Sequence, residues 1–244
     1  MYKKKNKIPR IIPRIDIKNS DLVKGVNLEG FRVLGKPEEF SGLYYREGAD
    51  ELFFQDTVAS LYGRNSLHDI IKKTSKNIFI PLAVGGGLKS IKDIENVLKS
   101  GADKVSINTA AVRKPNFINL ASKEFGSSTI IVSVETIKDN NGSYKVLTDS
   151  GRELTKKNTI DWSKEIQDRG AGEICLTSIR QEGTGKGFDV ELFDLLSSSL
   201  EIPVIIHGGA GKLKHFKKFN NKIPDGFVVS SCLHYSYLKK NTKI

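Results

Sequence analysis

Eight short runs of apolar and β-branched residues recur along the chain, separated by segments in which apolar residues have helical spacing. In order, the runs are RIIPRIDI, ELFFQDT, IPLAVGG, KVSINTA, TIIVSVET, EICLTSI, IPVIIHGG and GFVVSS. The segment from Ser90 to Gly101 carries a full set of helix signals, with Ser90 as N-cap, Asp93 three residues later and a closing glycine. Eight strand–helix units in 244 residues predict a closed (β/α)8 barrel, with a doubly wound sheet as the alternative.

The chain also repeats itself in two halves. IPLAVGGGLKS at 80–90 matches IPVIIHGGAGK at 202–212, and GADELFFQDTVAS matches GAGEICLTSIRQEGT with the same offset of 122 residues. A repeat of this kind predicts a two-fold half-barrel architecture. We therefore expect a single TIM-barrel domain over residues 1–244, with half-barrels at roughly 8–125 and 126–238.

The length of the apolar runs and the net charge indicate which kind of protein this is and which partners it has. The longest apolar runs fall short of the roughly 20 residues of a membrane helix, and the opening MYKKKNKIPR lacks the apolar stretch of a secretory signal. The net charge of +11 would suit an anionic partner, but the lysines are dispersed apart from YKKKNK and KLKHFKKFNNK, without interleaved aromatic residues. We expect a soluble, cytoplasmic protein without a nucleic-acid or membrane partner.

Two glycine-rich turns follow strands at matching positions of the repeat. Such turns expose backbone N–H groups near the positive end of a helix, which favours bound anions. GGAGK at 208–212, with Ser230 and Ser231, would form the phosphate site that barrels commonly build after strands seven and eight. GGG at 85–87, with Asn108 and Thr109, would form a second, so the predicted ligand carries a phosphate at each end.

Two carboxylates end predicted strands that stand four positions apart. Asp16 and Glu135 should therefore face one another across the mouth of a barrel, an arrangement suited to general acid–base catalysis. The alternative is that each caps a helix or pairs locally. Arg14 should point inward too and favour the ionised form of Asp16, which makes Asp16 the predicted base.

Charged residues also stand at the opposite end of the predicted barrel. They open the first, second, fourth and sixth strands: Arg10, Glu51, Lys104 and Glu173. Charges at this end are usually solvated or form stabilising pairs. A ring of two acids and two bases would also suit the gate of a passage through the barrel.

Metal, cofactor and disulfide sites have no support in the sequence. The histidines are scattered and no carboxylate cluster accompanies them: His68, His207, His215 and His234. Cys175 and Cys232 lie far apart and lack the close spacing of a metal site, so we expect buried, reduced thiols. We expect neither a metal ion nor a cofactor.

Several of these stretches together resemble one known family. They are IIPRIDIKNSDLVKG, DELFFQDTVAS, VGGGLKS, GADKVSINTAAV, RGAGEICLTSI, EGT and GGAGK. From about Arg10 to Leu233 the chain resembles HisF, the cyclase subunit of imidazole glycerol phosphate synthase. SINTAAV favours this subunit over the sister isomerase HisA, which shares the half-barrel repeat.

The resemblance implies a (β/α)8-barrel lyase of histidine biosynthesis, which closes an imidazole ring on a bis-phosphorylated ribonucleotide. The ammonia would come from a HisH-like glutaminase docked at the N-terminal barrel face. Asp16 and Glu135 would be catalytic, with Lys24 on a loop over the substrate. One phosphate would bind Gly87, Asn108 and Thr109, and the other Gly183, Gly209, Ser230 and Ser231. The ammonia gate would be Arg10, Glu51, Lys104 and Glu173.

The chain departs from the family pattern around the mouth. Glu135 stands where the family has aspartate, Arg14 where it has a small residue, and His207 where it usually has serine, while IRQEGT replaces IDRDGT. The predicted gate is intact. Two alternatives therefore stay open: a paralogue that uses ammonia to convert an acetamido sugar to an acetamidino sugar for surface polysaccharide, and a non-catalytic barrel that binds or activates a glutaminase.

Overall fold

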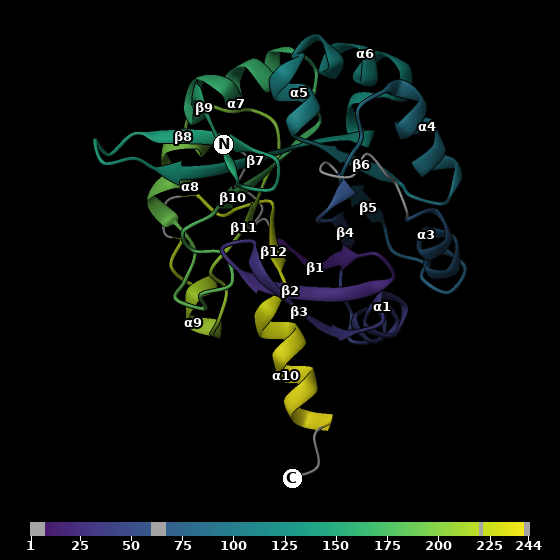
Figure 1. Ribbon diagram of the computed structural model, residues 1–244. Helices are drawn as coiled ribbons and strands as arrows, with labels where there is room; N and C mark the ends of the chain where they lie inside the picture. Colours follow the sequence, from purple (N-terminus) through teal and green to yellow (C-terminus); the bar gives the residue numbers. More distant parts are fainter. Residues whose placement is uncertain (1–7, 60–66, 220–221, 242–244) are drawn as a thin grey trace, which may run out of the picture.

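The computed structural model describes residues 8–59, 67–219 and 222–241, and its centre is a closed barrel of parallel strands (Figure 1). The barrel strands are β1 (Arg10–Lys18), β4 (Leu52–Asp56), β5 (Leu82–Gly85), β6 (Lys104–Ile107), β7 (Ile130–Lys138), β10 (Glu173–Ser178), β11 (Val204–His207) and β12 (Gly226–Val229). Each pairs in parallel with the next, β12 pairs with β1, and β7 with β10. All eight predicted strands are confirmed, and closure excludes the doubly wound sheet.

Helices follow the strands and surround the barrel (Figure 1). They are α1 (Pro37–Arg46), α3 (His68–Ser75), α4 (Ile91–Lys99), α5 (Thr109–Arg113), α6 (Asn116–Phe125), η1 (Ser127–Thr129), α7 (Thr159–Asp168), α8 (Val190–Ser197), α9 (Leu213–Phe216) and α10 (Ser231–Asn241). The predicted cap of α4 is confirmed, because Ser90 and Asp93 form a reciprocal capping box. Among the described residues, no helix is long and apolar enough to cross a membrane.

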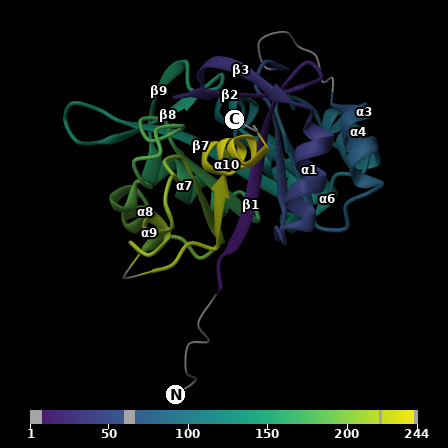
Figure 2. The same cartoon turned by 90° about the horizontal axis from the view of Figure 1, so that it is seen from below.

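Two antiparallel hairpins, which the sequence analysis did not predict, extend the barrel strands. The first is β2 (Asp21–Val26) with β3 (Glu29–Gly35), and the second is β8 (Tyr144–Thr148) with β9 (Glu153–Asn158). β2 pairs with the end of β1, and β8 pairs with the end of β7. Figure 2 shows both hairpins at the end of the barrel opposite the start of β1. Each half thus contains a long strand that continues into a hairpin.

This repetition of elements supports the predicted division of the chain. We propose one domain made of two half-barrels, with the boundary between α6, which ends at Phe125, and β7, which begins at Ile130. The division at residues 125 and 126 falls in this connection.

Inward-facing side chains form three layers because successive side chains of a strand point to opposite faces. The floor, where the strands begin, is charged and contains Arg10 and Glu51. The middle layer is apolar and fully buried: Ile12, Phe53, Ala83, Ile131, Cys175, Ile205 and Val228. The roof is polar and contains Arg14, Asp16 and Glu135, all buried. Outward residues such as Ile15 and Ile17 belong to the separate apolar cluster beneath the helices.

We predict that the middle layer is needed for stability. Phe53→Ala should lower the free energy of unfolding by about 3–5 kcal/mol, because it removes a fully buried ring and leaves a cavity. Phe79 is 80% exposed, so Phe79→Ala should change it by less than about 0.5 kcal/mol. Urea unfolding of both variants measures the difference, and equal costs would contradict a packed middle layer.

Candidate active site

The four predicted gate residues meet in one ion-pair network at the floor of the barrel. Arg10 bonds both to Glu51 and to Glu173, and the Lys104 ammonium lies 3.0 Å from Glu51 Oε2 and 3.4 Å from Glu173 Oε2. The Glu51 side chain is 1% exposed, and burial raises its pKa. The network brings two acids and two bases together across the entrance to the barrel interior.

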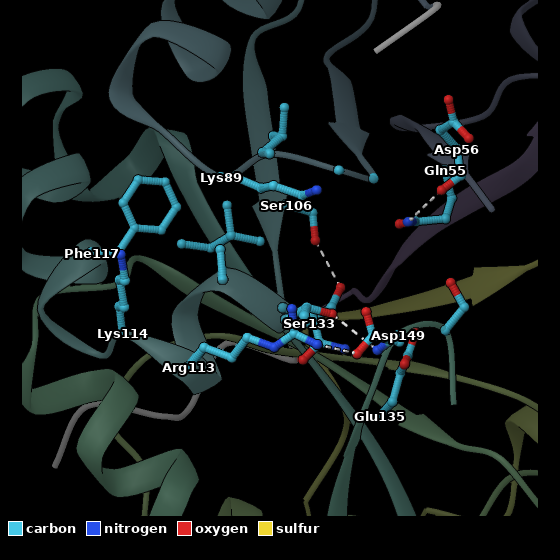
Figure 3. Close-up of a pocket in the computed structure, with 18 of the residues that line it drawn as sticks. Gln55, Asp56, Lys89, Ser106, Arg113, Lys114, Phe117, Ser133, Glu135 and Asp149 are labelled. Carbon is cyan, nitrogen blue, oxygen red and sulfur yellow. Dashed lines mark hydrogen bonds and ion pairs between the residues drawn. The ribbon is translucent and has the colours of Figure 1, made fainter. Parts of the chain in front are cut away.

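A cavity of about 440 Å³ opens at the other end, where β4, β5, β6 and β7 finish. Three residues predicted to bind phosphate line it: Gly87, Asn108 and Thr109. Gly87 has a φ of +68°, and a Cβ there would lie 2.6 Å from the Ala59 side chain, so the turn requires glycine. The lining includes three cations: Lys89, Arg113 and Lys114. Figure 3 shows Arg113 directed toward Asp149, with which it forms an ion pair.

The inner part of the cavity is polar and holds Glu135. The Ser106 and Ser133 hydroxyls lie 2.7 Å apart, and both residues line the cavity beside Glu135 (Figure 3). Glu135 Oε2 and Asn108 Oδ1 are buried and find no hydrogen-bond partner among the described residues. Burial raises the pKa of Glu135 to about 7, although the Arg14 charge opposes this shift. A carboxyl that titrates near neutrality beside a cavity is suited to proton transfer.

Asp16 lies outside the cavity, in a buried cluster of charges. Its Oδ1 accepts a 2.7 Å hydrogen bond from Arg14 Nε, and its Oδ2 lies 3.1 Å from Lys24 Nζ. Lys24 also bonds to Glu182, and the side chains of Asp16, Lys24 and Glu182 have no exposed surface. Although burial alone would raise the pKa of Asp16, the Arg14 and Lys24 cations hold it well below its usual range.

Lys24 was predicted on a loop over the substrate, and its position in the structure is more constrained. It lies in β2, and Glu182 contacts both this strand and the turn that follows it. The Glu182 carboxylate accepts the backbone N–H of Leu28, and its backbone carbonyl accepts that of Asn27. The hairpin is therefore closed over this side of the barrel.

The second set of predicted phosphate residues lies outside the cavity. The lining of the cavity, within the described part of the chain, does not include Gly183, Gly209, Ser230 or Ser231. Gly183 packs directly against the β2–β3 hairpin, since a Cβ there would lie 2.7 Å from the Gly25 carbonyl oxygen. The structure thus places one set of predicted phosphate residues in the cavity and the other set outside it.

Sequence reasoning missed several residues of the site. Ser106 and Ser133 could have been found, because each stands two positions from a predicted inward residue, Lys104 or Glu135. Glu182 was noted only as a departure from the family pattern. Its contact with Lys24 joins residues 158 positions apart and depends on the fold.

Among the described residues, no group of three or more His, Cys, Asp or Glu side chains is placed so that it could hold a metal ion. Both cysteines are free. Cys175 is buried as expected, whereas Cys232 is only half-buried.

Comparisons with known proteins identify the family. Residues 10–239 match the family described as histidine biosynthesis protein. The chain is 53% identical over 207 residues to the HisF subunit of imidazole glycerol phosphate synthase from Legionella pneumophila, covering 85% of this chain and 98% of the relative. It is 44% identical to the same subunit from Campylobacter concisus, and the match covers 94% of this chain and 91% of the relative. It is also 44% identical to the subunit from Sulfolobus acidocaldarius, and that match covers 92% of this chain and 90% of the relative.

The barrel, its glycine turns and this match define the class: the chain belongs to the histidine biosynthesis protein family of (β/α)8 barrels. Within that family it belongs to the HisF group, as the relatives of 44–53% identity indicate.

We predict an unusual pH dependence of stability from Glu135. Its pKa is 4.5 in an unfolded chain and about 7 when buried, so between these values the folded state binds more protons and stability falls as pH rises. Glu135→Gln removes this loss. Relative to wild type, the variant should gain about 3 kcal/mol of unfolding free energy between about pH 4.5 and about pH 8.

Urea unfolding across this pH range measures the effect. The matched control is Glu124→Gln, since Glu124 is exposed on α6 and should show no such gain. An equal pH dependence in wild type and Glu135→Gln would contradict the raised pKa.

Proposed function

We propose that this protein is the cyclase subunit of an imidazole glycerol phosphate synthase, a lyase of histidine biosynthesis that uses ammonia from a glutaminase subunit. The single observation that carries the proposal is the arrangement of two sites in one barrel of the HisF group. A ring of four charges closes the floor, and a cavity with glycine-turn residues and a buried carboxyl lies at the roof. A cytoplasmic location is part of this proposal.

The proposed substrate is a bis-phosphorylated ribonucleotide. One phosphate would lie against Gly87, Asn108 and Thr109, where Lys89 and Lys114 add positive charge to the cavity. The other would lie against Gly183, Gly209, Ser230 and Ser231, which follow β10, β11 and β12 at the same end of the barrel. The comparisons do not support the acetamidino-forming or the non-catalytic alternative, since the reported relatives are named as synthase subunits.

The reaction needs groups that move protons. Ring closure with ammonia forms carbon–nitrogen bonds, releases water from a carbonyl carbon and breaks the carbon–nitrogen bond to the other half of the ribonucleotide. Protons must therefore leave the attacking nitrogen and reach the departing oxygen and the departing nitrogen. Carboxyl and amine side chains near the reacting atoms perform such transfers. We propose Asp16, Glu135 and Lys24 as the catalytic residues. The pKa of Glu135 near 7 suits it to transfer protons, whereas Asp16 and Lys24, which are paired with each other, supply fixed charges.

The floor supports the proposed passage of ammonia. Arg10, Glu51, Lys104 and Glu173 close the entrance through ion pairs, and the apolar middle layer lies directly inside it. Neutral ammonia can cross an apolar layer, whereas ammonium would have to shed its hydration at high cost. Opening of the ion pairs would admit ammonia, and the closed ion pairs would exclude water from the barrel at other times.

The same face carries exposed apolar side chains that suit a docked glutaminase subunit. Ile8, Phe79 and Ile223 are 87%, 80% and 45% exposed, and each precedes a barrel strand at its N-terminal end. Exposed apolar residues around a functional entrance favour a protein partner. We propose that they form the rim of the interface.

The function is tested by turnover of the bis-phosphorylated ribonucleotide with the glutaminase present. We expect glutamine-dependent activity in wild type and about tenfold less in Lys104→Met, because that change leaves two buried acids of the floor with one cation. Turnover driven by added ammonium salt should be retained. The control is Lys99→Met, which removes an exposed lysine of α4 and should leave glutamine-dependent turnover unchanged. Absence of turnover with either nitrogen source would contradict the function.

The docking face gives a separate prediction. Phe79→Asp should weaken binding of the glutaminase about 30-fold, the equivalent of about 2 kcal/mol for an apolar contact replaced by a charge. The matched control is Leu213→Asp, because Leu213 is 84% exposed but lies beyond β11, toward the other end of the barrel. Titration calorimetry measures both affinities. Equal affinities would place the interface elsewhere.

A further inference from the structure

Arg14 occupies the centre of the barrel roof. Its side chain is buried, and its guanidinium carbon lies 5.8 Å from the centre of the Phe53 ring in the middle layer. It donates from Nε to Asp16, and its Nη1 lies 3.5 Å from His207 Nδ1. Burial holds the pKa of His207 well below its usual range, so this imidazole is neutral. The ion-pair partner of Arg14 is therefore Asp16.

Asp16 is fully engaged by cations. Arg14 binds one of its oxygens and Lys24 the other, and no part of its surface is exposed. To accept a proton, this carboxylate would have to give up one of two buried ion pairs and leave a cation without its partner, which costs several kcal/mol. Asp16 is thus held as an anion while the cluster is intact.

Glu135 has the opposite environment in the same layer. It lines the open cavity, and its buried Oε2 has no hydrogen-bond partner among the described residues. A backbone hydrogen bond from Gly151 favours its charged form. Protonation of Glu135 breaks no ion pair with any residue that the structure describes, so this carboxyl can gain and lose a proton.

We propose that Arg14 divides the roles of the two facing carboxylates: it fixes Asp16 as a permanent anion and leaves Glu135 as the group that exchanges protons with the bound acceptor. Arg14 is a positioning residue, because it does not line the cavity and acts through Asp16 and through its charge on Glu135. The catalytic half of the proposal rests on the proposed function. The assignment of ionisation states to Asp16 and Glu135 is independent of the proposed function.

The charges around Glu135 agree with this division. Arg14 on β1 lowers its pKa, whereas Asp16 on β1 and Asp149 after β8 raise it, with burial the largest effect. Several other groups of the roof contact one another: Lys24 on β2 with Glu182 after β10, Arg113 on α5 with Asp149, and neutral His207 on β11 with Thr177. The cavity that Glu135 lines also contains Asp56 at the end of β4, Lys89 before α4 and Lys114 after α5. Cys175 below is also neutral, because burial raises its pKa to about 12.

The direct test is a carboxyl titration of the whole protein by ¹³C NMR, with the Glu135 signal assigned from its loss in Glu135→Gln. In wild type, Glu135 should titrate near pH 7, and Asp16 should stay ionised throughout the stable range. Titration of Asp16 near neutrality, or of Glu135 near its ordinary value of 4.5, would overturn the proposal. This measurement needs no variant of Arg14.

Variants of Arg14 separate its charge from its bulk. Arg14→Met should move the Glu135 midpoint upward by about one pH unit, because it removes the cation that favours the charged form. Arg14→Lys should restore the wild-type midpoint. Lys24→Met is the matched control, since it removes the other buried cation of Asp16 and should shift Glu135 less. An unmoved midpoint in Arg14→Met would refute the assignment.

The pH profile of kcat tests the catalytic half, with the glutaminase omitted and free ammonia held constant. The ionisation seen in kcat should follow the NMR midpoint of Glu135 in wild type, Arg14→Met and Arg14→Lys. A profile that does not move with this midpoint would overturn the role of Glu135 in proton exchange. The NMR titration requires no substrate. A failure of the proposed function would therefore appear only as absent turnover, and it can be told apart from a failure of the assigned ionisation states.

Discussion

The alternation of side chains along a closed parallel barrel is the constraint on which this protein depends. Because every second residue of a strand points inward, β1 alone contributes Arg10 to the floor, Ile12 to the middle and Arg14 with Asp16 to the roof. The other strands follow the same order. A charged entrance, an apolar centre and a polar mouth therefore come from one geometric rule applied around the barrel.

The two halves share this geometry but differ in charge. Both long strands continue into a hairpin, and the hairpins pair at corresponding positions near Asp16 and Glu135. The β2–β3 hairpin is held by the ion pair between Lys24 and Glu182, whereas the turn of the β8–β9 hairpin lines the open cavity. A repeated backbone thus yields two hairpins with different contacts, because among the described residues the buried ion pairs hold the β2–β3 hairpin and not the β8–β9 hairpin.

The buried cluster around Asp16 carries a cost that argues for a functional reason. Burying charges requires loss of hydration, and a buried ion pair is often no more stable than apolar side chains of similar volume. Arg14, Asp16, Lys24 and Glu182 nonetheless replace an apolar core at the roof. What they provide is a fixed electrostatic environment beside a cavity, which favours preorganised catalysis over maximal stability.

The sequence by itself determined the eight strands, the capped helix α4, the barrel closure and the family, since these depend on local periodicity and on repeated motifs. It also placed the four floor charges correctly, because alternation from the strand starts fixes their direction. Only the tertiary structure decided that Lys24 reaches Glu182 and that both side chains are fully buried. Such contacts join distant segments, and burial and ion pairing, which set whether Asp16 or Glu135 can carry a proton, exist only once the chain has folded.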